Sequence, residues 1–186
     1  MTTGLTAEII AAMPDPELII RLMKKLRKLT ASGHLLKNSL GYTEVLMEEL
    51  YALASSLYDK GQFYEAGEFF QELFHLDPLS YKICYGFGAT AQQTEEWYKA
   101  ISLYAYAAEN KPDAPEPLYF SAECAIQIGK EAGAADLYRK AAALCGDKAE
   151  YKELKERSQA LAASLEKRIK GGQAPLCLQD EPKKSS

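Results

Sequence analysis

The cysteines are the side chains of this sequence with the most potential for metal binding or redox chemistry. There are four, Cys84, Cys124, Cys145 and Cys177, at separations of 40, 21 and 32 residues. No two of them form a C-x-x-C pair, so the spacing is neither that of a zinc site nor that of a redox motif. We therefore expect free thiols in a reducing cytosol, with Cys84 and Cys124 as small buried side chains.

Two further patterns that could support chemistry lack the context they need. His34 and His75 lie 41 residues apart, and no serine or cysteine beside either has an orienting carboxylate at a suitable spacing. Residues 86–91, GFGATA, match the dinucleotide fingerprint G-x-G-x-x-A, but that motif requires a preceding strand and here lies within a predicted helix. The sequence thus predicts no catalytic residue, no metal site and no cofactor.

Three tyrosines recur at an interval that suggests a binding role. Tyr51, Tyr85 and Tyr119 are each 34 residues apart. Tyrosine combines a large apolar area with few rotatable bonds and a hydroxyl that can bond a peptide backbone. A row of such tyrosines, here called the tyrosine ladder, suits the binding of an extended apolar peptide segment. The alternative for all three is packing in the core.

The 34-residue interval extends to six columns of residues, which predicts an all-α fold. Small residues recur where the two helices of a hairpin approach closely, large apolar residues where hairpins interdigitate, and Pro or Gly where the second helix ends. This is the tetratricopeptide-repeat pattern, so we expect a solenoid of three helix-turn-helix repeats at residues 47–80, 81–114 and 115–148. The columns are Ala66, Ala100 and Ala134; Leu50, Cys84 and Leu118; Ala54, Gly88 and Ala122; Phe70, Tyr104 and Tyr138; Leu73, Ala107 and Ala141; and Pro78, Pro112 and Gly146.

The first helix of each repeat should line a concave groove, which is where such solenoids bind extended peptides. Helical phase places the second, fifth, ninth, twelfth and thirteenth residues of each repeat on this side. Tyr104 and Tyr138 belong to a packing column and are expected in the core instead. The predicted groove residues are Tyr51, Ser55, Tyr58, Tyr85, Ala89, Gln92, Tyr119, Glu123 and Ile126, with Glu48, Lys82 and Glu116 as further charges.

The segments on either side of the repeats differ from them in pattern. Residues 1–46 contain a predicted amphipathic helix that begins near Asp15 and Pro16 and ends near Gly33. Its apolar face needs a partner, either the repeats or a second subunit. Residues 149–170 predict a helix that caps the last repeat, and residues 171–186 lack periodicity and are expected to be disordered. The apolar face of the first helix consists of Leu18, Leu22, Leu26 and Leu29.

Charge and hydropathy exclude several classes of partner. Residues 47–148 carry 16 Asp and Glu against 8 Lys and Arg, a net charge of −8, within a chain whose net charge is −4. An acidic centre repels phosphate groups, so nucleic acid is not expected as a partner. No apolar run approaches the roughly 20 residues of a membrane helix. The N-terminus lacks the pattern of a secretory signal, so neither stable membrane association nor secretion is expected.

The groove positions also argue against recognition of a C-terminal carboxylate. Repeats that clamp such a carboxylate resemble one another in carrying Lys, Arg and Asn at particular inner positions. Here those positions hold Tyr51, Ser55, Gly86, Glu116 and Phe120. A carboxylate would meet Glu116 rather than a cation, so this mode of binding is rejected.

Four stretches of the chain together resemble one family of tetratricopeptide proteins. They are LYALASSLYDKGQFYEAGEFFQELFHLDP (50–78), GFGATAQ (86–92), AISLYAYAA (100–108) and EPLYFSAEC (116–124). The joint occurrence of LY-LA, LDP, G-GA-Q and AEC is similar to the class II chaperones of bacterial type III secretion, the SycD/LcrH-like group. The resemblance runs from about Gly33 to Leu154.

This resemblance implies a non-enzymatic chaperone in the bacterial cytoplasm. It would bind hydrophobic translocator proteins before export and hold a short extended segment, containing proline and leucine, in the concave groove. The N-terminal leucine face would then form a homodimer. The groove residues that match the family are the aromatic ones Tyr51, Tyr58, Phe63, Tyr85 and Tyr119.

Two glutamates depart from these patterns. Glu131 stands where the resemblance implies an aromatic residue, as at Phe63 and Trp97, so the third repeat departs from the family pattern at this point. Glu95 stands where Gly61 provides the turn of the first repeat, so the second repeat must turn in another way.

The sequence leaves three alternatives to a groove-binding chaperone open. A scaffold protein would dock folded partners through its outer, convex surface and would tolerate mutations in the groove. An enzyme would need a chemical centre that we do not find. A regulator of transcription that hands over a partner is compatible with chaperoning.

Overall fold

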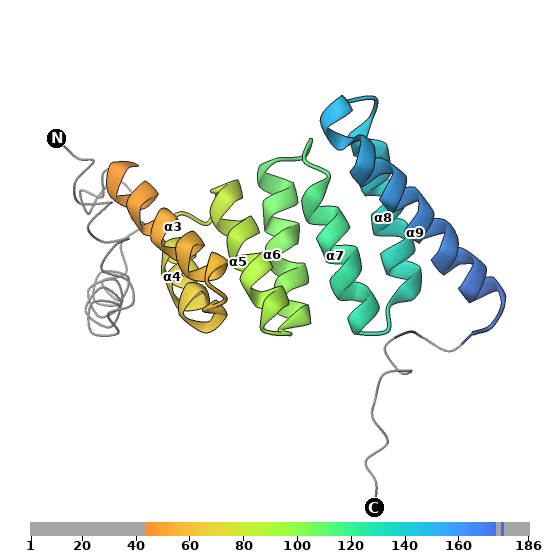
Figure 1. Cartoon of the computed structure of the whole chain (residues 1–186), viewed down its shortest axis with the longest axis horizontal. Coiled ribbons are helices and arrows are strands. Elements are labelled where there is room, and N and C mark those ends of the chain that lie inside the picture. The colour runs from red at the N-terminus through yellow and green to blue at the C-terminus, as the bar shows by residue number, and fades with distance from the viewer. Residues whose placement is uncertain (1–43, 174–175, 177–186) are drawn as a thin grey trace, which may run out of the picture. The chain divides into compact units, whose positions relative to one another are not determined.

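The computed structural model describes residues 44–173 and Leu176, and these residues form helices without a strand (Figure 1). This confirms the predicted all-α class. The predicted helix with Leu18, Leu22, Leu26 and Leu29 and most of the C-terminal tail lie outside the described residues. The helices are α3 (Glu44–Asp59), α4 (Phe63–Leu76), α5 (Tyr81–Gln93), α6 (Trp97–Asn110), α7 (Glu116–Gln127), α8 (Glu131–Cys145), the short 3₁₀ helix η1 (Ala149–Tyr151) and α9 (Lys152–Lys170).

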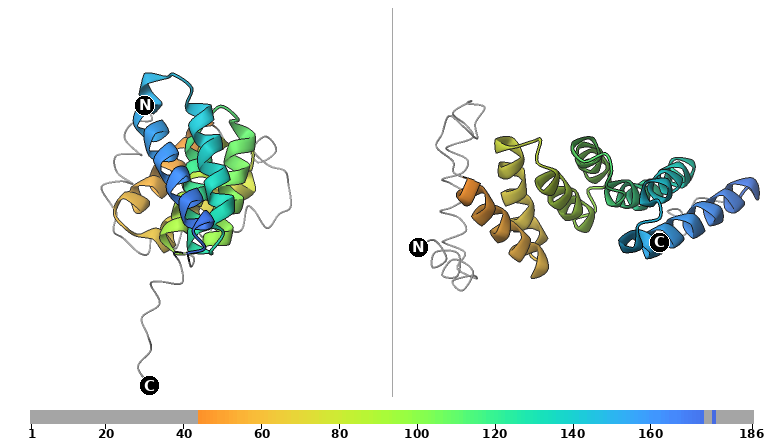
Figure 2. Two further views of the ribbon diagram at one scale, coloured as in Figure 1. Left: turned by 90° about the vertical axis from the view of Figure 1, so that its right-hand side faces the viewer. Right: turned by 90° about the horizontal axis from the view of Figure 1, so that it is seen from above.

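The chain divides into two compact units at the boundary between Thr94 and Glu95. The first unit holds α3, α4 and α5, and the second holds α6 to α9 with η1. Within each unit, every α-helix packs against the next one along the chain, as α8 and α9 do in Figure 2. The predicted repeats each contain two of these helices, but the boundary between the units falls inside the second repeat.

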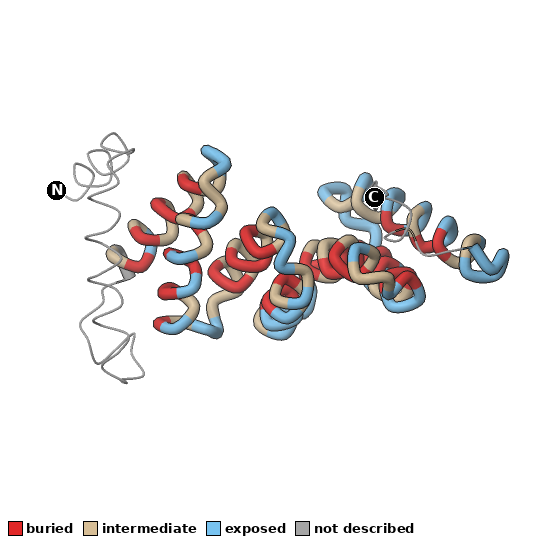
Figure 3. The backbone as a smooth tube through the Cα atoms, turned by 90° about the horizontal axis from the view of Figure 1, so that it is seen from below, coloured by how far each residue is buried: buried red, intermediate tan, exposed pale blue. Residues whose placement is uncertain are grey.

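Residues of the repeat columns form the cores of both units. Ala66 in the first unit, and Ala100 and Ala134 in the second, are completely buried. Tyr104 and Tyr138 are each 1% exposed, which confirms that they are core residues. In Figure 3, buried and exposed positions alternate along the helices, as expected for amphipathic helices that pack through one side. The columns therefore mark the surfaces through which neighbouring helices contact each other.

A glycine allows the close contact between α4 and α5 in the first unit. Gly86 of α5 lies against the ring of Phe70 on α4, and a Cβ atom at position 86 would stand 2.6 Å from two carbons of that ring. Phe70 is 2% exposed, so its ring has no solvent-filled space into which it could move. A side chain at position 86 would therefore push the two helices apart.

Left-handed residues end several helices. Gly61 (φ 76°) follows α3 and Gly129 (φ 73°) follows α7, each with the two backbone hydrogen bonds of a Schellman motif. The expectation that the second repeat turns in another way is wrong, because Glu95 after α5 adopts the same left-handed conformation (φ 61°). The fold thus imposes on a glutamate a conformation that glycine adopts at much lower cost.

The second unit closes around its own cluster of buried side chains. Tyr119 and Ala122 of α7, Tyr138 of α8 and Leu165 of α9 all belong to this cluster. Leu176 packs against it from beyond the end of α9, although the sequence predicts disorder for residues 171–186. None of the described helices combines the length and apolar character that crossing a membrane would require.

Candidate functional site

Two helices of the first unit present the predicted binding residues on one side of each helix. On α3, Tyr51, Ser55 and Tyr58 are half-buried, whereas Leu53 and Leu57 on the opposite side are 3% and 0% exposed. The same division occurs on α5, where three polar or small residues are half-buried and the packing residues are buried. We call the half-buried residues the aromatic face; they are Tyr51, Ser55, Tyr58, Tyr85, Ala89 and Gln92.

Ring contacts hold the tyrosines of the aromatic face in position. Tyr85 stacks on Tyr81, one turn earlier in α5, with 5.7 Å between the ring centroids. Tyr51 meets the buried ring of Phe70 edge-on at 5.8 Å. Such contacts restrict the rotamers before any ligand arrives, which lowers the entropic cost of binding.

Phe63, the first residue of α4, extends this arrangement at the turn between α3 and α4. Its ring meets that of Tyr58 at 5.2 Å in a T-shaped contact, and both side chains are half-buried. Burial raises the pKa of the Tyr58 hydroxyl, and a hydrogen bond with Gln93 opposes that shift. Tyr58 therefore stays neutral at physiological pH and can both donate and accept hydrogen bonds.

Lys82 joins α3 to α5 at one end of the aromatic face. Its Nζ forms an ion pair with Glu48 and lies 5.0 Å from the centroid of the Tyr51 ring, within cation–π range. From the sequence, Glu48 and Lys82 were predicted only as charges near the groove, and this link was missed. The signal was available, because the two residues have opposite charge and occupy the same place in successive repeats.

The third tyrosine of the predicted ladder does not face an open surface. Tyr119 on α7 is 2% exposed, so its assignment to the groove is corrected to the core of the second unit. Its ring contacts that of Tyr138 at 5.3 Å, and the guanidinium of Arg157 lies over it at 5.5 Å. The physical reason is that Arg157 of α9 lies over the Tyr119 ring and Tyr138 of α8 packs beside it. Burial, with the nearby charge of Glu123, raises the pKa of Tyr119 to about 12.

The two remaining predicted residues of α7 are accessible. Glu123 and Ile126 are half-buried in the second unit, and Ile126 packs in part against its core cluster. They offer one carboxylate and one apolar side chain to a ligand of this unit. Nine of the ten predicted groove residues are thus partly accessible, and Tyr119 is the exception.

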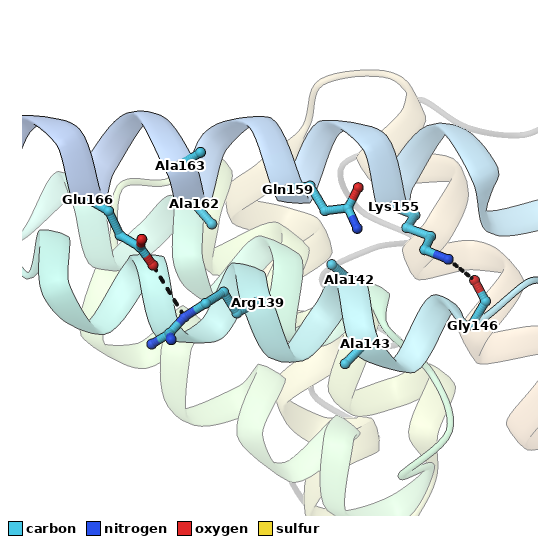
Figure 4. Close-up of a pocket in the computed structure, with 9 residues that line it drawn as sticks. All are labelled: Arg139, Ala142, Ala143, Gly146, Lys155, Gln159, Ala162, Ala163 and Glu166. Carbon is cyan, nitrogen blue, oxygen red and sulfur yellow. Dashed lines mark hydrogen bonds and ion pairs between the residues drawn. The ribbon is translucent and has the colours of Figure 1, made fainter.

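An open groove also lies between α8 and α9 in the second unit (Figure 4). Arg139 in its lining lies 3.5 Å from Glu166, and Lys155 donates a hydrogen bond of 2.6 Å to the carbonyl of Gly146. The lining residues include no histidine, serine or cysteine. Four alanines make up much of the lining: Ala142, Ala143, Ala162 and Ala163.

The thiols of the described residues are suited to packing rather than to chemistry. Cys84, Cys124 and Cys145 are not in disulfide bonds and are completely buried. Burial raises the pKa of Cys124 to about 12, and it also raises the pKa of Cys145, so neither is a thiolate at neutral pH. Among the residues that the structure describes, no group of His, Cys, Asp or Glu could hold a metal ion.

Comparison with known proteins identifies the relatives of this chain. Residues 47–78 match the tetratricopeptide repeat family. The chain is 33% identical over 119 residues to the low calcium response locus protein H of Yersinia pestis, a match that covers 64% of this chain and 71% of that protein. The chain belongs to the type III secretion translocator chaperones.

Solved structures of translocator chaperones share its fold. PcrH, in complex with the chaperone binding region of PopD, superposes with a TM-score of 0.67 at 29% identity, covering 69% of this chain and 97% of that one. SycD of Yersinia enterocolitica, in complex with a peptide of the translocator YopD, gives a TM-score of 0.66 at 29% identity, covering 69% and 98%. SycD has also been solved in an alternative dimer.

Proposed function

We propose that this protein is a non-enzymatic cytoplasmic chaperone that binds hydrophobic type III secretion translocators before export. In this proposal, an extended apolar segment of the client lies along the aromatic face of the first unit. The observation that carries the proposal is the set of half-buried tyrosines on α3 and α5. Their rings are held by neighbouring side chains and remain accessible.

The chemistry of this face fits such a client. Tyrosine rings supply apolar contact area, and their hydroxyls, with Ser55 and Gln92, can bond the backbone of a peptide that lacks secondary structure of its own. Two relatives, PcrH and SycD, are solved with segments of translocators bound. Covering an apolar client segment would prevent its aggregation or premature assembly before export.

Homodimerisation is part of the same proposal. The sequence predicts an amphipathic helix with Leu18, Leu22, Leu26 and Leu29 on its apolar face, which a second copy could cover, and SycD forms dimers. These leucines lie outside the described residues, so the support comes from the sequence pattern and from the relative.

The test is binding of a client peptide to full-length protein with a single tyrosine removed. Candidate hydrophobic translocators are first co-expressed with the chain, and calorimetry then measures the Kd of a short apolar peptide from whichever client is retained. We expect Tyr85→Ala to weaken binding by about 1–3 kcal/mol, or roughly 5- to 150-fold, because the ring makes contacts in the complex. Helical content should be unchanged, since Tyr85 is half-buried and lies outside the packing columns.

Tyr64→Ala is the matched control. Tyr64 belongs to the same unit but lies on α4 and is 77% exposed, away from the aromatic face. Its removal should leave the Kd unchanged. The opposite result, with Tyr64→Ala impaired and Tyr85→Ala normal, would contradict the proposal and favour a scaffold that docks partners through its outer surface.

A further inference from the structure

A buried glutamate in the second unit departs from the repeat pattern. Glu131 is the first residue of α8 and occupies the place held by Phe63 and Trp97 in the other repeats. It is 6% exposed, so its carboxylate is largely removed from water. A charged group in this position requires compensating partners within the protein.

The partners of Glu131 come from the C-terminal end of the described chain. The backbone N–H of Leu176 donates a hydrogen bond of 2.7 Å to a carboxylate oxygen of Glu131. The guanidinium of Arg168, in the last turn of α9, lies 3.8 Å from the same oxygen. Leu176 also packs its side chain against the core cluster of the second unit. A phenylalanine or tryptophan at position 131 could not accept the hydrogen bond from Leu176.

The end of α9 turns the chain back toward this contact. Gly172 has a left-handed conformation (φ 64°), and its N–H bonds the carbonyl of Ile169 at 3.1 Å. The N–H of Gln173 bonds the carbonyl of Arg168 at 3.2 Å. These two hydrogen bonds form a Schellman motif, which reverses the chain direction after a helix.

We propose that Gly171, Gly172, Gln173 and Leu176 form a C-terminal clasp, for which Glu131 is the anchoring site. The clasp fastens the end of α9 to the start of α8 through one charge-assisted hydrogen bond and one apolar side chain. Leu176 of the same chain thus occupies the site that Glu131 provides in the second unit.

Exchange of the Leu176 amide hydrogen, measured by NMR on the full-length chain, tests the clasp directly. In the wild type this amide should be protected from exchange by its hydrogen bond. Glu131→Ala removes the acceptor and should speed exchange at Leu176 roughly tenfold to a hundredfold. Glu131→Gln keeps an acceptor oxygen and should retain part of the protection.

Glu153→Ala is the matched control, because Glu153 is also a first-turn glutamate of a helix in this unit but is exposed. It should leave exchange at Leu176 unchanged. If Glu131→Ala fails to fold, Gly172→Val offers a second route, since a β-branched residue is strained at a left-handed position and should release the clasp with Glu131 intact. An unprotected Leu176 amide in the wild type, or equal exchange rates in wild type and Glu131→Ala, would overturn the proposal.

Discussion

At the residue scale, identical side chains at equivalent repeat positions differ in burial, as seen for Tyr51, Tyr85 and Tyr119. All three occupy the same place in their repeats, and the first two are half-buried. Tyr119 is buried because Tyr138 packs beside its ring and Arg157 of α9 lies over it. Helical phase predicts the side of a helix on which a residue lies, but it does not predict whether another element covers that side.

Gly86→Ala should destabilise the protein, although alanine is the better helix former. The added Cβ would meet the buried ring of Phe70 at 2.6 Å, and forcing an extra group into a packed contact costs about 1–3 kcal/mol. This cost exceeds the gain of about 1 kcal/mol that alanine brings to a helix interior. Urea unfolding of the full-length protein measures the difference in the free energy of unfolding.

Gly133→Ala provides the control for that measurement. Gly133 lies within α8, and a Cβ there would meet nothing within 4 Å. Only the helix propensity changes, so Gly133→Ala should raise the free energy of unfolding by up to about 1 kcal/mol. Equal effects of the two substitutions would show that Gly86 and the ring of Phe70 are not in close contact.

At the element scale, the turn inside each of the three repeats contains one residue with a left-handed φ. Gly61, Gly129 and Glu95 all adopt a left-handed φ, and only Glu95 carries a side chain that disfavours it. A left-handed conformation costs a non-glycine residue roughly 1–2 kcal/mol.

Glu95→Gly should stabilise the protein by about 0.5–1 kcal/mol, because relief of the left-handed conformation outweighs the added freedom of the unfolded chain. Thermal unfolding detects this as a higher Tm. The reverse type of substitution, Gly61→Ala, should lower the Tm, because alanine is strained at this left-handed position (φ 76°). Nothing lies within 4 Å of the added Cβ, so a steric clash does not contribute to the effect. A lower Tm for Glu95→Gly would contradict this account.

The repeat columns allow the helices to be predicted because periodicity reports which residues are buried. Ala66, Phe70 and Leu73 of α4, for example, follow the helical period and are all at most 2% exposed. The boundary between the units could not be predicted in this way, because it falls within a repeat. Nor could the contact of Glu131 with Leu176, since a local pattern carries no information about residues 45 positions apart.

Helical periodicity also predicts which residues of the candidate site lie on the side opposite the packing columns, but not whether another element covers them. Tyr85 and Gln92 lie on the expected side of α5 and are accessible, because their phase opposes that of the packing columns. Tyr119 was assigned to the same surface and is buried, because the position of α9 depends on tertiary packing.

At the scale of the whole molecule, charge makes a small contribution to the proposed function. The net charge is −4, and the aromatic face carries no charged side chain of its own. The ion pair of Lys82 with Glu48 at its edge is neutral as a pair. Apolar and backbone contacts should therefore account for most of the affinity.

Client binding should consequently depend little on ionic strength. Raising the salt concentration from about 50 mM to about 500 mM screens exposed charges strongly and should change the Kd of the client peptide by less than about threefold. Calorimetry in the two buffers measures this. Weakening by an order of magnitude would instead show that complementary charges drive the association.

The contact between Gly86 and Phe70 has a consequence for the order in which this sequence can evolve. A side chain at position 86 is harmful while the ring of Phe70 is present, but it becomes tolerable once a smaller residue stands at position 70. Loss of the ring alone would leave a cavity, so each single step is unfavourable while the pair of changes is not. Positions 70 and 86 therefore form an epistatic pair. Related sequences should carry either glycine at 86 with a large ring at 70, or a side chain at 86 with a smaller residue at 70, and rarely only one of the two changes.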